Sequence, residues 1–460
     1  MNEETIAALS TPPGRGGIAV IRVSGPRAGP LLHELIEGAP DPLQPNLCFH
    51  GYLRANGADD AGGRLDECLA LFFRAPHSFT GEDVAEISLH ANPFIVEEAL
   101  DLLARRGARP ALAGEFSFRA WRNGKIDLLQ AEAIHELVFA NSRAYARLAF
   151  SGLEGALSQE VARLRQRLLE LAIAVETAIE FQEDQALGEI PLGEGIAEMC
   201  EAVEAVLRSA RFGERLNRGL QVVIAGKVNA GKSSLFNALL LQERAITSAA
   251  PGTTRDYLSE TLILDGFPFV LNDVAGLATA QEGGGDAVEQ EAITRSWQKI
   301  EASDAVVFLF DASETPSPDD LRLFQRAVGS RPHLVVANKA DIASEAAVAL
   351  IRASFGSRVP LISATQGRNL ETVREFLKSL RADLGGLESS LAVNRRQQQL
   401  FERLREKLQG LRKMFATPRL FVELAGEEVR QALGVIGELT GEVGVDDVLQ
   451  GIFANFCIGK

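Results

Sequence analysis

The chain has 460 residues, of which 46% are hydrophobic and 24% charged, and its net charge is −15. This composition is ordinary for a globular protein of about three domains, and the acidic balance argues against broad, sequence-independent nucleic-acid binding. Four scattered cysteines, no run of about 18 apolar residues and an N-terminus without a basic start predict a cytoplasmic protein. They also argue against a disulfide framework, a zinc site, a membrane span and a secretion signal.

The first two regions of the chain differ in their hydrophobic pattern. Along residues 1–120, short apolar runs such as 17–25 alternate with Gly/Pro turns, and a helical pattern covers 94–107. These patterns predict a mixed α/β domain. In residues 121–217, Leu, Ala, Glu and Arg recur at helical spacing, which predicts the first part of a helical domain.

Residues 218–384 repeat the order strand, loop, helix. Apolar runs end in polar loops at 220–226, 267–276, 304–313, 333–341 and 359–366. This order is typical of a doubly wound, mainly parallel sheet with crossover helices. Residues 385–460 return to helical patterns, so we expect the α/β unit to be inserted between the two parts of the helical domain.

The first of these strands leads into the segment GKVNAGKSS. It carries the G-x-x-x-x-G-K-[ST] pattern between Gly226 and Ser233, in the required position between a strand and a helix. Glycines let backbone N–H groups surround phosphates, Lys232 can reach the β and γ oxygens, and Ser233 can hold Mg²⁺. A chance Gly/Lys turn is the alternative, and three further motifs in the expected order argue against it.

The further motifs predict GTP as the nucleotide. Asp273 and Gly276 of DVAG follow a strand, where the carboxylate can bind Mg²⁺ through water and the glycine amide can meet the γ-phosphate. The Asp341 carboxylate of NKAD can accept both N–H groups on the Watson–Crick edge of guanine, where adenine presents an acceptor. The predicted GTP contacts are Asn229, Ala230, Gly231, Lys232, Ser233, Ser234, Thr253, Thr254, Asp273, Gly276, Asn338, Lys339, Asp341, Ser363 and Ala364.

The sequence around the phosphate loop departs from many GTPases. Leu277 stands where a water-orienting Gln is common, and no arginine finger is evident. Asn229 and the hydroxyls and carbonyls of AITSAAPGTTRD could instead hold a monovalent cation against the β and γ phosphates. For Asn229, a plain hydrogen bond within the loop is equally compatible with the spacing. Thr254 is the second predicted Mg²⁺ ligand beside Ser233.

Several long stretches outside the generic GTPase loops are distinctive: TIAALSTPPGRGGIAVIRVSGP, SFTGEDVAEI, GEFSFRAWRNGKIDLLQAEA, PGTTRD and the closing FCIGK. With the Asn-containing phosphate loop and NKAD, they make nearly the whole chain resemble the bacterial and organellar tRNA-modification GTPases of the MnmE/TrmE family. The resemblance implies a multidomain α/β plus all-α fold. Residues 1–120 would bind tetrahydrofolate and form a homodimer, 218–384 would be the GTPase domain, and 121–217 with 385–460 the helical domain.

The resemblance also implies a reaction. Members of the family work with an FAD-containing partner of the MnmG/GidA type, in a heterotetramer or a larger complex. They add an aminomethyl or carboxymethylaminomethyl group to carbon 5 of the wobble uridine of certain tRNAs. The carbon comes from a folate, the 5,10-methylene or 5-formyl derivative of tetrahydrofolate, and K⁺ stimulates GTP hydrolysis.

Residue roles follow by matching motifs. The resemblance implies folate contacts at Arg22, Glu82, Lys125 and Lys460, K⁺ ligands at Asn229, Ser248, Ala250 and Thr253, and Mg²⁺ ligands at Ser233 and Thr254. Glu289 would orient the attacking water, and Cys457 is the candidate catalytic side chain outside the GTP site. Cys457 could be a nucleophile, a proton donor or a spectator. Taken without the resemblance, the four folate residues would more often be ordinary surface charges.

Several sequence features bear on the rate of hydrolysis, on tRNA binding and on competing functions. Val274 replaces the Thr of the family's DTAG, and AQEGGGD adds residues before Glu289, which bears on the rate of hydrolysis. The basic segment 394–413 fits either tRNA phosphates or a solvated helix face with i,i+4 ion pairs. The competing function is a GTP-regulated assembly factor or scaffold, for example in ribosome maturation, without one-carbon chemistry. A prenylated membrane switch is disfavoured, because Gly459 and Lys460 do not fit a prenylation signal.

Overall fold

The computed structural model describes residues 4–55, 63–181, 192–241, 259–274, 287–356, 358–382, 391–416, 422–442, 452–454, 456 and 459. The chain forms two compact units. The first comprises Met1–Glu136, Phe150–Glu204 and Arg395–Lys460, and the second comprises Leu137–Ala149 and Ala205–Asn394. The fold class predicted from the sequence, multidomain α/β plus all-α, is confirmed, whereas the predicted domain limits stay predictions.

The first unit contains a seven-stranded sheet in the order β3-β4-β5-β6-β2-β1-β7. Neighbouring strands are antiparallel except β1 and β7, which pair in parallel. The strands are β1 (Thr5–Leu9), β2 (Gly16–Ser24), β3 (Ile36–Glu37), β4 (Cys48–Arg54), β5 (Arg64–Phe73), β6 (Val84–Ala91) and β7 (Ala108–Pro110).

Alternation along the strands decides which face of this sheet is covered. Ala19, Ile21 and Ala70 are buried with residues of α1 (Ala28–Leu35) and α2 (Pro93–Arg105). Successive side chains of a strand point to opposite faces, so their neighbours Ile18 and Leu69 point away from these two helices. Ile18 and Leu69 are 68% and 47% exposed, and this second face is therefore partly open.

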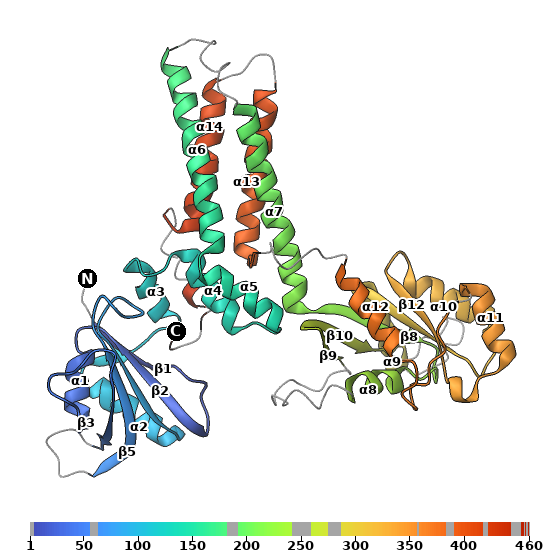
Figure 1. Ribbon diagram of the computed structural model, residues 1–460, viewed down its shortest axis with the longest axis horizontal. Coiled ribbons are helices and arrows are strands. Elements are labelled where there is room, and N and C mark those ends of the chain that lie inside the picture. Colours follow the sequence, from blue (N-terminus) through green and yellow to red (C-terminus); the bar gives the residue numbers. More distant parts are fainter. Residues whose placement is uncertain are drawn as a thin grey trace. The chain divides into compact units, whose positions relative to one another are not determined.

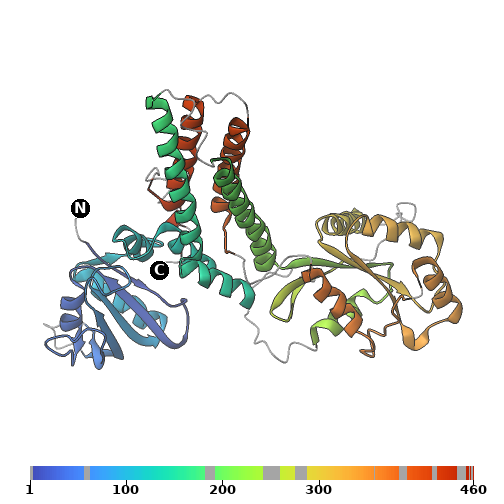
Figure 2. The same cartoon turned by 45° about the horizontal axis from the view of Figure 1, so that its top comes forward.

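The rest of the first unit is helical. Four long helices run side by side in both ribbon views (Figures 1 and 2). They are α6 (Ala156–Phe181), α7 (Leu192–Arg218), α13 (Arg395–Phe415) and α14 (Val422–Thr440); α7 belongs to the first unit as far as Glu204 and to the second from Ala205. The shorter helices α3 (Glu115–Arg122) and most of α4 (Leu128–Val138) also belong to the first unit, whereas most of α5 (Arg143–Leu153) belongs to the second. No helix in the described part of the chain is both long and apolar enough to cross a membrane.

The second unit has a five-stranded sheet in the order β12-β11-β8-β10-β9, parallel except for the β9–β10 hairpin. Its strands are β8 (Leu220–Gly226), β9 (Ser259–Leu264), β10 (Phe267–Asp273), β11 (Ala305–Asp311) and β12 (His333–Asn338). Its helices are α8 (Lys232–Leu241), α9 (Ala287–Glu301), α10 (Pro318–Val328), α11 (Glu345–Phe355) and α12 (Glu371–Ala382), with a 3₁₀ turn at Ala340–Ile342.

Both faces of this sheet are buried, as expected for crossover helices. Val222 and Ile224 of β8 pack in the cluster that includes α8 and α12, while Val223 and Ala225 pack in the cluster that includes α9 and α10. The continuous apolar run of β8 therefore reflects a strand buried on two sides.

Two elements differ from the sequence prediction. Residues 359–366, predicted as a fifth strand, form only an isolated parallel bridge between Ala337 and Leu361. Pro360 has no N–H to donate, so the ladder cannot extend in that direction. The edge strand β9 was not predicted, because it becomes recognisable only through its antiparallel pairing with β10.

Candidate functional site

The phosphate loop joins β8 to α8, and its backbone requires unusual dihedrals. The φ angles of Gly226, Asn229 and Gly231 are 151°, 65° and 90°. A Cβ on Gly226 would lie 2.6 Å from the carbonyl oxygen of Leu309, so glycine is also required there sterically. The loop thus has the tight, glycine-dependent form that exposes N–H groups to an anion.

Lys232 begins α8 and is only 7% exposed. Its Nζ donates a hydrogen bond to the carbonyl oxygen of Lys227 at 2.9 Å. Burial lowers the pKa of Lys232, and the opposing charge of Asp273 only partly offsets this. A nucleotide phosphate would stabilise the buried ammonium group.

The residues for Mg²⁺ lie at the end of β10 and the start of α8. Ser233 Oγ donates to Asp273 Oδ2 at 2.6 Å. The other carboxylate oxygen, Asp273 Oδ1, is buried and has no hydrogen-bond partner among the described residues. A hydroxyl beside a carboxylate with an unpartnered oxygen fits Mg²⁺ and its bound water, because Mg²⁺ prefers oxygen ligands.

The NKAD motif is tied to the phosphate loop through Asn338. Its Nδ2 donates to the carbonyl oxygen of Ala230 at 2.8 Å, and its Oδ1 accepts from the amide of Ala364 at 3.0 Å. Lys339, with a φ of 63°, forms an ion pair with Asp311 at 2.5 Å. The two loops that would contact phosphate and base are therefore held together by one buried side chain.

Asp341 is exposed beside the fully buried Ser363. Ser363 Oγ donates to Asp341 Oδ1 at 2.6 Å, and this hydrogen bond is the main reason that the pKa of Asp341 is lowered. The carboxylate is consequently ionised at neutral pH and able to accept N–H groups from a guanine base.

Several predicted site residues fall outside what the structure describes. Ser248, Ala250, Thr253, Thr254, Gly276, Cys457 and Lys460 lie outside the described residues. Glu289 is part of α9, and its side chain lies outside the described part of the structure. Val274 is 4% exposed and belongs to the same buried cluster as Trp297 and Ile300 of α9. The methyl groups of Val274 thus fill a position where a threonine hydroxyl would be buried.

A second group of predicted residues meets at one end of the N-terminal sheet. Lys125 packs over the loop that leads to Glu82: a Cβ on Gly81 would lie 3.3 Å from Lys125 Cγ. Lys125 Nζ also donates to the carbonyl oxygen of Pro76 at 2.9 Å. Glu82 and Lys125, far apart in the sequence, are therefore neighbours.

Arg22 of β2 lies at the same end of the sheet. Its guanidinium pairs with Glu86 at 2.8 Å and lies 5.6 and 5.8 Å from the ring centroids of Phe79 and Phe116. Arg22 NH1 is also 3.5 Å from the carbonyl oxygen of Gly459. The C-terminal segment thus returns to the predicted folate residues one position before Lys460.

Close packing holds this C-terminal segment in place. Phe453 and Phe456 are buried in one cluster, and a Cβ on Gly114 would lie 2.5 Å from the carbonyl oxygen of Phe453. Ser10 Oγ donates to the carbonyl oxygen of Gly459 at 3.1 Å. Aromatic burial, the close approach of Gly114 to Phe453 and the Ser10 hydrogen bond therefore anchor the described residues of this segment.

Sequence reasoning missed the buried charges of α3. Glu115 and Arg119 are 9% and 6% exposed, and they stand four residues apart beside the buried Phe116 and Ala120. Charged residues on the apolar face of a short helix were the available signal, since such residues are rarely buried without a partner.

The basic helix α13 is largely paired within the protein. Its ion pairs are Arg396–Glu132, Arg403–Glu438, Arg405–Glu204 and Lys407–Glu428. These contacts favour the interpretation of α13 as a helix with a paired face over a continuous phosphate-binding surface.

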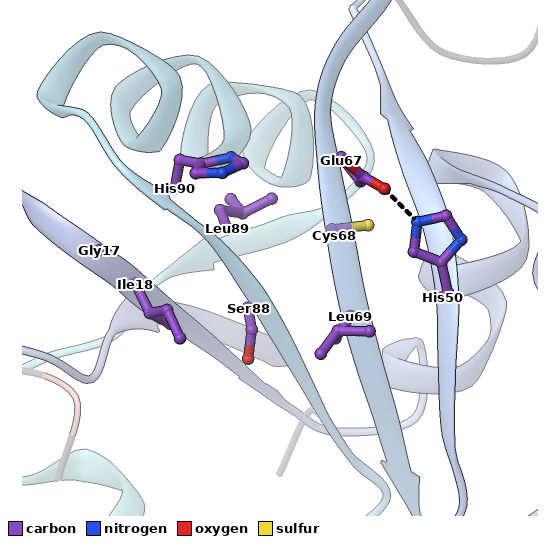
Figure 3. Close-up of a pocket in the computed structure, with 9 residues that line it drawn as sticks. All are labelled: Gly17, Ile18, His50, Glu67, Cys68, Leu69, Ser88, Leu89 and His90. Carbon is purple, nitrogen blue, oxygen red and sulfur yellow. Dashed lines mark hydrogen bonds and ion pairs between the residues drawn. The ribbon is translucent and has the colours of Figure 1, made fainter.

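A separate cavity of about 320 Å³ lies over β2, β4, β5 and β6 (Figure 3). It is lined by Gly17, Ile18, His50, Glu67, Cys68, Leu69, Ser88, Leu89 and His90. Glu67 pairs with His50 at 2.7 Å. Burial raises the pKa of the Cys68 thiol to about 11, so this cysteine is not a reactive thiolate at neutral pH. Of the predicted folate residues that the structure describes, Arg22, Glu82 and Lys125, none lines this cavity.

The glycine-dependent loop, the Ser233–Asp273 pair and the NKAD loop on a doubly wound sheet define a P-loop GTPase domain. Residues 5–125 match the family "GTP-binding protein TrmE N-terminus", and residues 128–457 match the family "MnmE helical domain". The tRNA modification GTPase MnmE of Aquifex aeolicus (strain VF5) is 37% identical over 99% of this chain and 100% of its own length. That of Sodalis glossinidius (strain morsitans) is 41% identical over 99% of both. The chain belongs to the MnmE family of tRNA modification GTPases.

Among solved structures, Era in complex with MgGDPNP and nucleotides of 16S ribosomal RNA is 27% identical over 35% of this chain and 55% of its own, with a TM-score of 0.29.

Proposed function

We propose that this protein hydrolyses GTP to support tRNA modification in the cytoplasm. With an FAD-containing partner of the MnmG/GidA type, it adds an aminomethyl or carboxymethylaminomethyl group to carbon 5 of the wobble uridine of certain tRNAs. The carbon comes from a tetrahydrofolate derivative. One observation carries the proposal: Arg22, Glu82 and Lys125 gather at one end of the N-terminal sheet, where Gly459 also contacts Arg22.

The chemistry of these residues suits a folate. A pterin presents an amide and amine edge that a carboxylate such as Glu82 can bind. The tail of a folate is anionic and suits Arg22, Lys125 and Lys460. We assign Cys457, two residues before Gly459 in the sequence, as the side chain that acts on the one-carbon unit.

In the GTPase domain, we assign phosphate binding to the loop and Lys232. Ser233 and, through water, Asp273 would hold Mg²⁺ together with Thr254, and the unpartnered Asp273 Oδ1 supports this assignment. When bound, Mg²⁺ supplies positive charge to the β and γ phosphate oxygens. Asp341 selects guanine.

We assign the stimulation of hydrolysis to a potassium ion. Its ligands would be Asn229, Ser248, Ala250 and Thr253, and Glu289 would orient the water. The left-handed φ of Asn229 holds this side chain at a bend in the phosphate loop, which supports its inclusion. The positive charge of the cation would replace that of an arginine finger.

We propose a homodimer formed through the N-terminal domain, within a heterotetramer or larger complex with the FAD-containing protein. The partly open sheet face with the exposed Ile18 and Leu69 supports this arrangement, because exposed apolar side chains on one sheet face commonly mark protein interfaces.

Mass analysis of tRNA wobble nucleosides tests the proposal. Cells that lack this protein should lose the modified wobble uridine, and the wild-type gene should restore it. A variant with both Glu82→Ala and Lys125→Ala should not restore it, because the folate would lose its contacts. Unchanged wobble uridine modification in the cells without the protein would contradict the proposal and favour an assembly factor.

A further inference from the structure

Arg119 of α3 is a buried cation between two carboxylates. Its NH1 donates to Glu82 Oε2 at 2.8 Å, and its NH2 donates to Glu115 Oε1 at 3.0 Å. The side chain of Arg119 is 8% exposed, that of Glu115 10% and that of Glu82 20%. Arg119 therefore joins a buried carboxylate to the one predicted to contact folate.

The Glu115 end of this arrangement is fixed. Arg109 donates to both carboxylate oxygens of Glu115, at 2.9 and 2.6 Å, and the amide of Leu112 donates to Oε2 at 2.9 Å. Burial alone would raise the pKa of Glu115, but these hydrogen bonds and that of Arg119 together lower it. Glu115 thus stays ionised and acts as a rigid support for Arg119.

The Glu82 end is held by hydroxyl groups as well. Ser24 Oγ lies 2.8 Å from Glu82 Oε2 and 2.7 Å from Thr80 Oγ1, and both Ser24 and Thr80 are fully buried. Ser24 donates its single hydroxyl proton to Glu82, so Thr80 must donate to Ser24. The amide of Glu82 donates in turn to Thr80 Oγ1 at 3.3 Å. The direction of every hydrogen bond in this ring is therefore determined.

Both side-chain donors meet Glu82 on the same oxygen. Arg119 and Ser24 bind Oε2, whereas Oε1 has no hydrogen bond to any residue within the described part of the chain. A carboxylate with one oxygen held and the other open presents a defined acceptor to a ligand.

We propose that Arg119 is a positioning residue for folate binding. Together with Ser24, it fixes Oε2 of Glu82 so that Oε1 is available to the amine and amide edge of the pterin. This inference rests on the proposed function, in which Glu82 contacts the folate. Arg119 acts through Glu82 and does not itself touch the ligand.

The test measures binding of 5-formyltetrahydrofolate to the full-length protein by equilibrium dialysis. Arg119→Met should weaken binding about tenfold or more, the usual loss when a hydrogen bond to a charged group is removed. Arg119→Lys should restore part of the affinity, because an ammonium group can still donate to Glu82. Arg122→Met, at an exposed arginine of the same helix, should bind as the wild type does.

A double-mutant cycle separates positioning from general destabilisation. If Arg119 acts through Glu82, the Arg119→Met/Glu82→Gln variant should bind no more weakly than Glu82→Gln alone. Fully additive losses, or wild-type affinity in Arg119→Met, would overturn the inference while leaving the folate site in place. A wild-type protein that fails to bind the folate would overturn the proposed function, and the inference with it.

A second variant covers the case in which Arg119→Met does not fold, since removing one partner of a buried ion pair is strongly destabilising. Ser24→Ala removes the other donor to Glu82 Oε2 without leaving a buried charge unpaired. It should also weaken folate binding, and its effect should likewise vanish in a Glu82→Gln background. Unchanged folate affinity in Ser24→Ala, with a wild-type melting temperature, would overturn the inference.

Discussion

The nucleotide site and the N-terminal charged site are assembled in different ways. The nucleotide site uses a contiguous loop, Gly226 to Ser233, together with short segments that directly follow β10 and β12. Parallel strands bring their carboxyl ends to one edge, so the sheet itself brings the motifs together, and the Asn338 side chain then ties the phosphate loop to the base-binding loop. The N-terminal site instead joins β2, the loop before β6, α3 and the C-terminal segment through buried ion pairs and hydroxyl groups. Function at the first site should depend on single residues, and at the second on a network.

The largest expected effect is on the rate of GTP hydrolysis at the nucleotide site. Lys232→Ala should lower the rate of GTP hydrolysis by about a hundredfold or more, because a buried cation at the β and γ phosphates would be lost. Steady-state phosphate release measures this rate. Lys378→Ala, which alters only the exposed pair with Asp265, is the matched control and should hydrolyse at the wild-type rate. Normal hydrolysis by Lys232→Ala would remove the phosphate loop from the mechanism.

The next largest effect is on tRNA modification at the N-terminal site. Cys457→Ser should abolish formation of the modified wobble uridine, since a serine hydroxyl is a much weaker nucleophile than a thiolate. Mass analysis of tRNA nucleosides from complemented cells measures the product. Cys48→Ser changes an exposed thiol and should restore modification. Wild-type levels of product with Cys457→Ser would show that this thiol is a spectator.

A potassium ion at the nucleotide site would make the rate of GTP hydrolysis depend on the cation in solution. GTP hydrolysis should be several-fold faster in KCl than in NaCl, because the cation would supply charge that no arginine supplies. Asn229→Gly should remove this preference, since glycine tolerates the φ of 65° and lacks the side-chain oxygen. Equal wild-type rates in the two salts would exclude a selective cation site.

The smallest effect tests the anchoring of the C-terminal segment. Gly459 has a φ of 95°, and a Cβ there would collide with the carbonyl oxygen of Leu9. Gly459→Ala should therefore displace the segment and weaken 5-formyltetrahydrofolate binding by a few-fold. Gly434→Ala is the matched control, because a Cβ at Gly434 meets no atom within 4 Å. Unchanged binding by Gly459→Ala would mean that the contact with Arg22 does not contribute to the site.

The sequence by itself determined the class of fold and the order of the GTPase motifs. The apolar run of β8, the glycines at 226 and 231 and the polar residues after β10 and β12 are local features. The conformations of these segments depend on the backbone preferences and the hydrophobic pattern of a few neighbouring residues. The sequence alone is therefore enough to predict them. The resemblance added candidate roles for Arg22, Glu82 and Lys125.

Only the tertiary structure decided which distant side chains share a site. Arg119 and Glu115 are a common i,i+4 pair in the sequence, and their burial against Glu82 and Arg109 depends on how α3 packs on the sheet. The ion pairs of α13 also depend on packing, because its arginines pair with glutamates of α4, α14 and α7, which lie beside it only in the folded chain. Burial makes an ion pair strong and its geometry specific, and burial is a property of packing that no single segment of the chain contains.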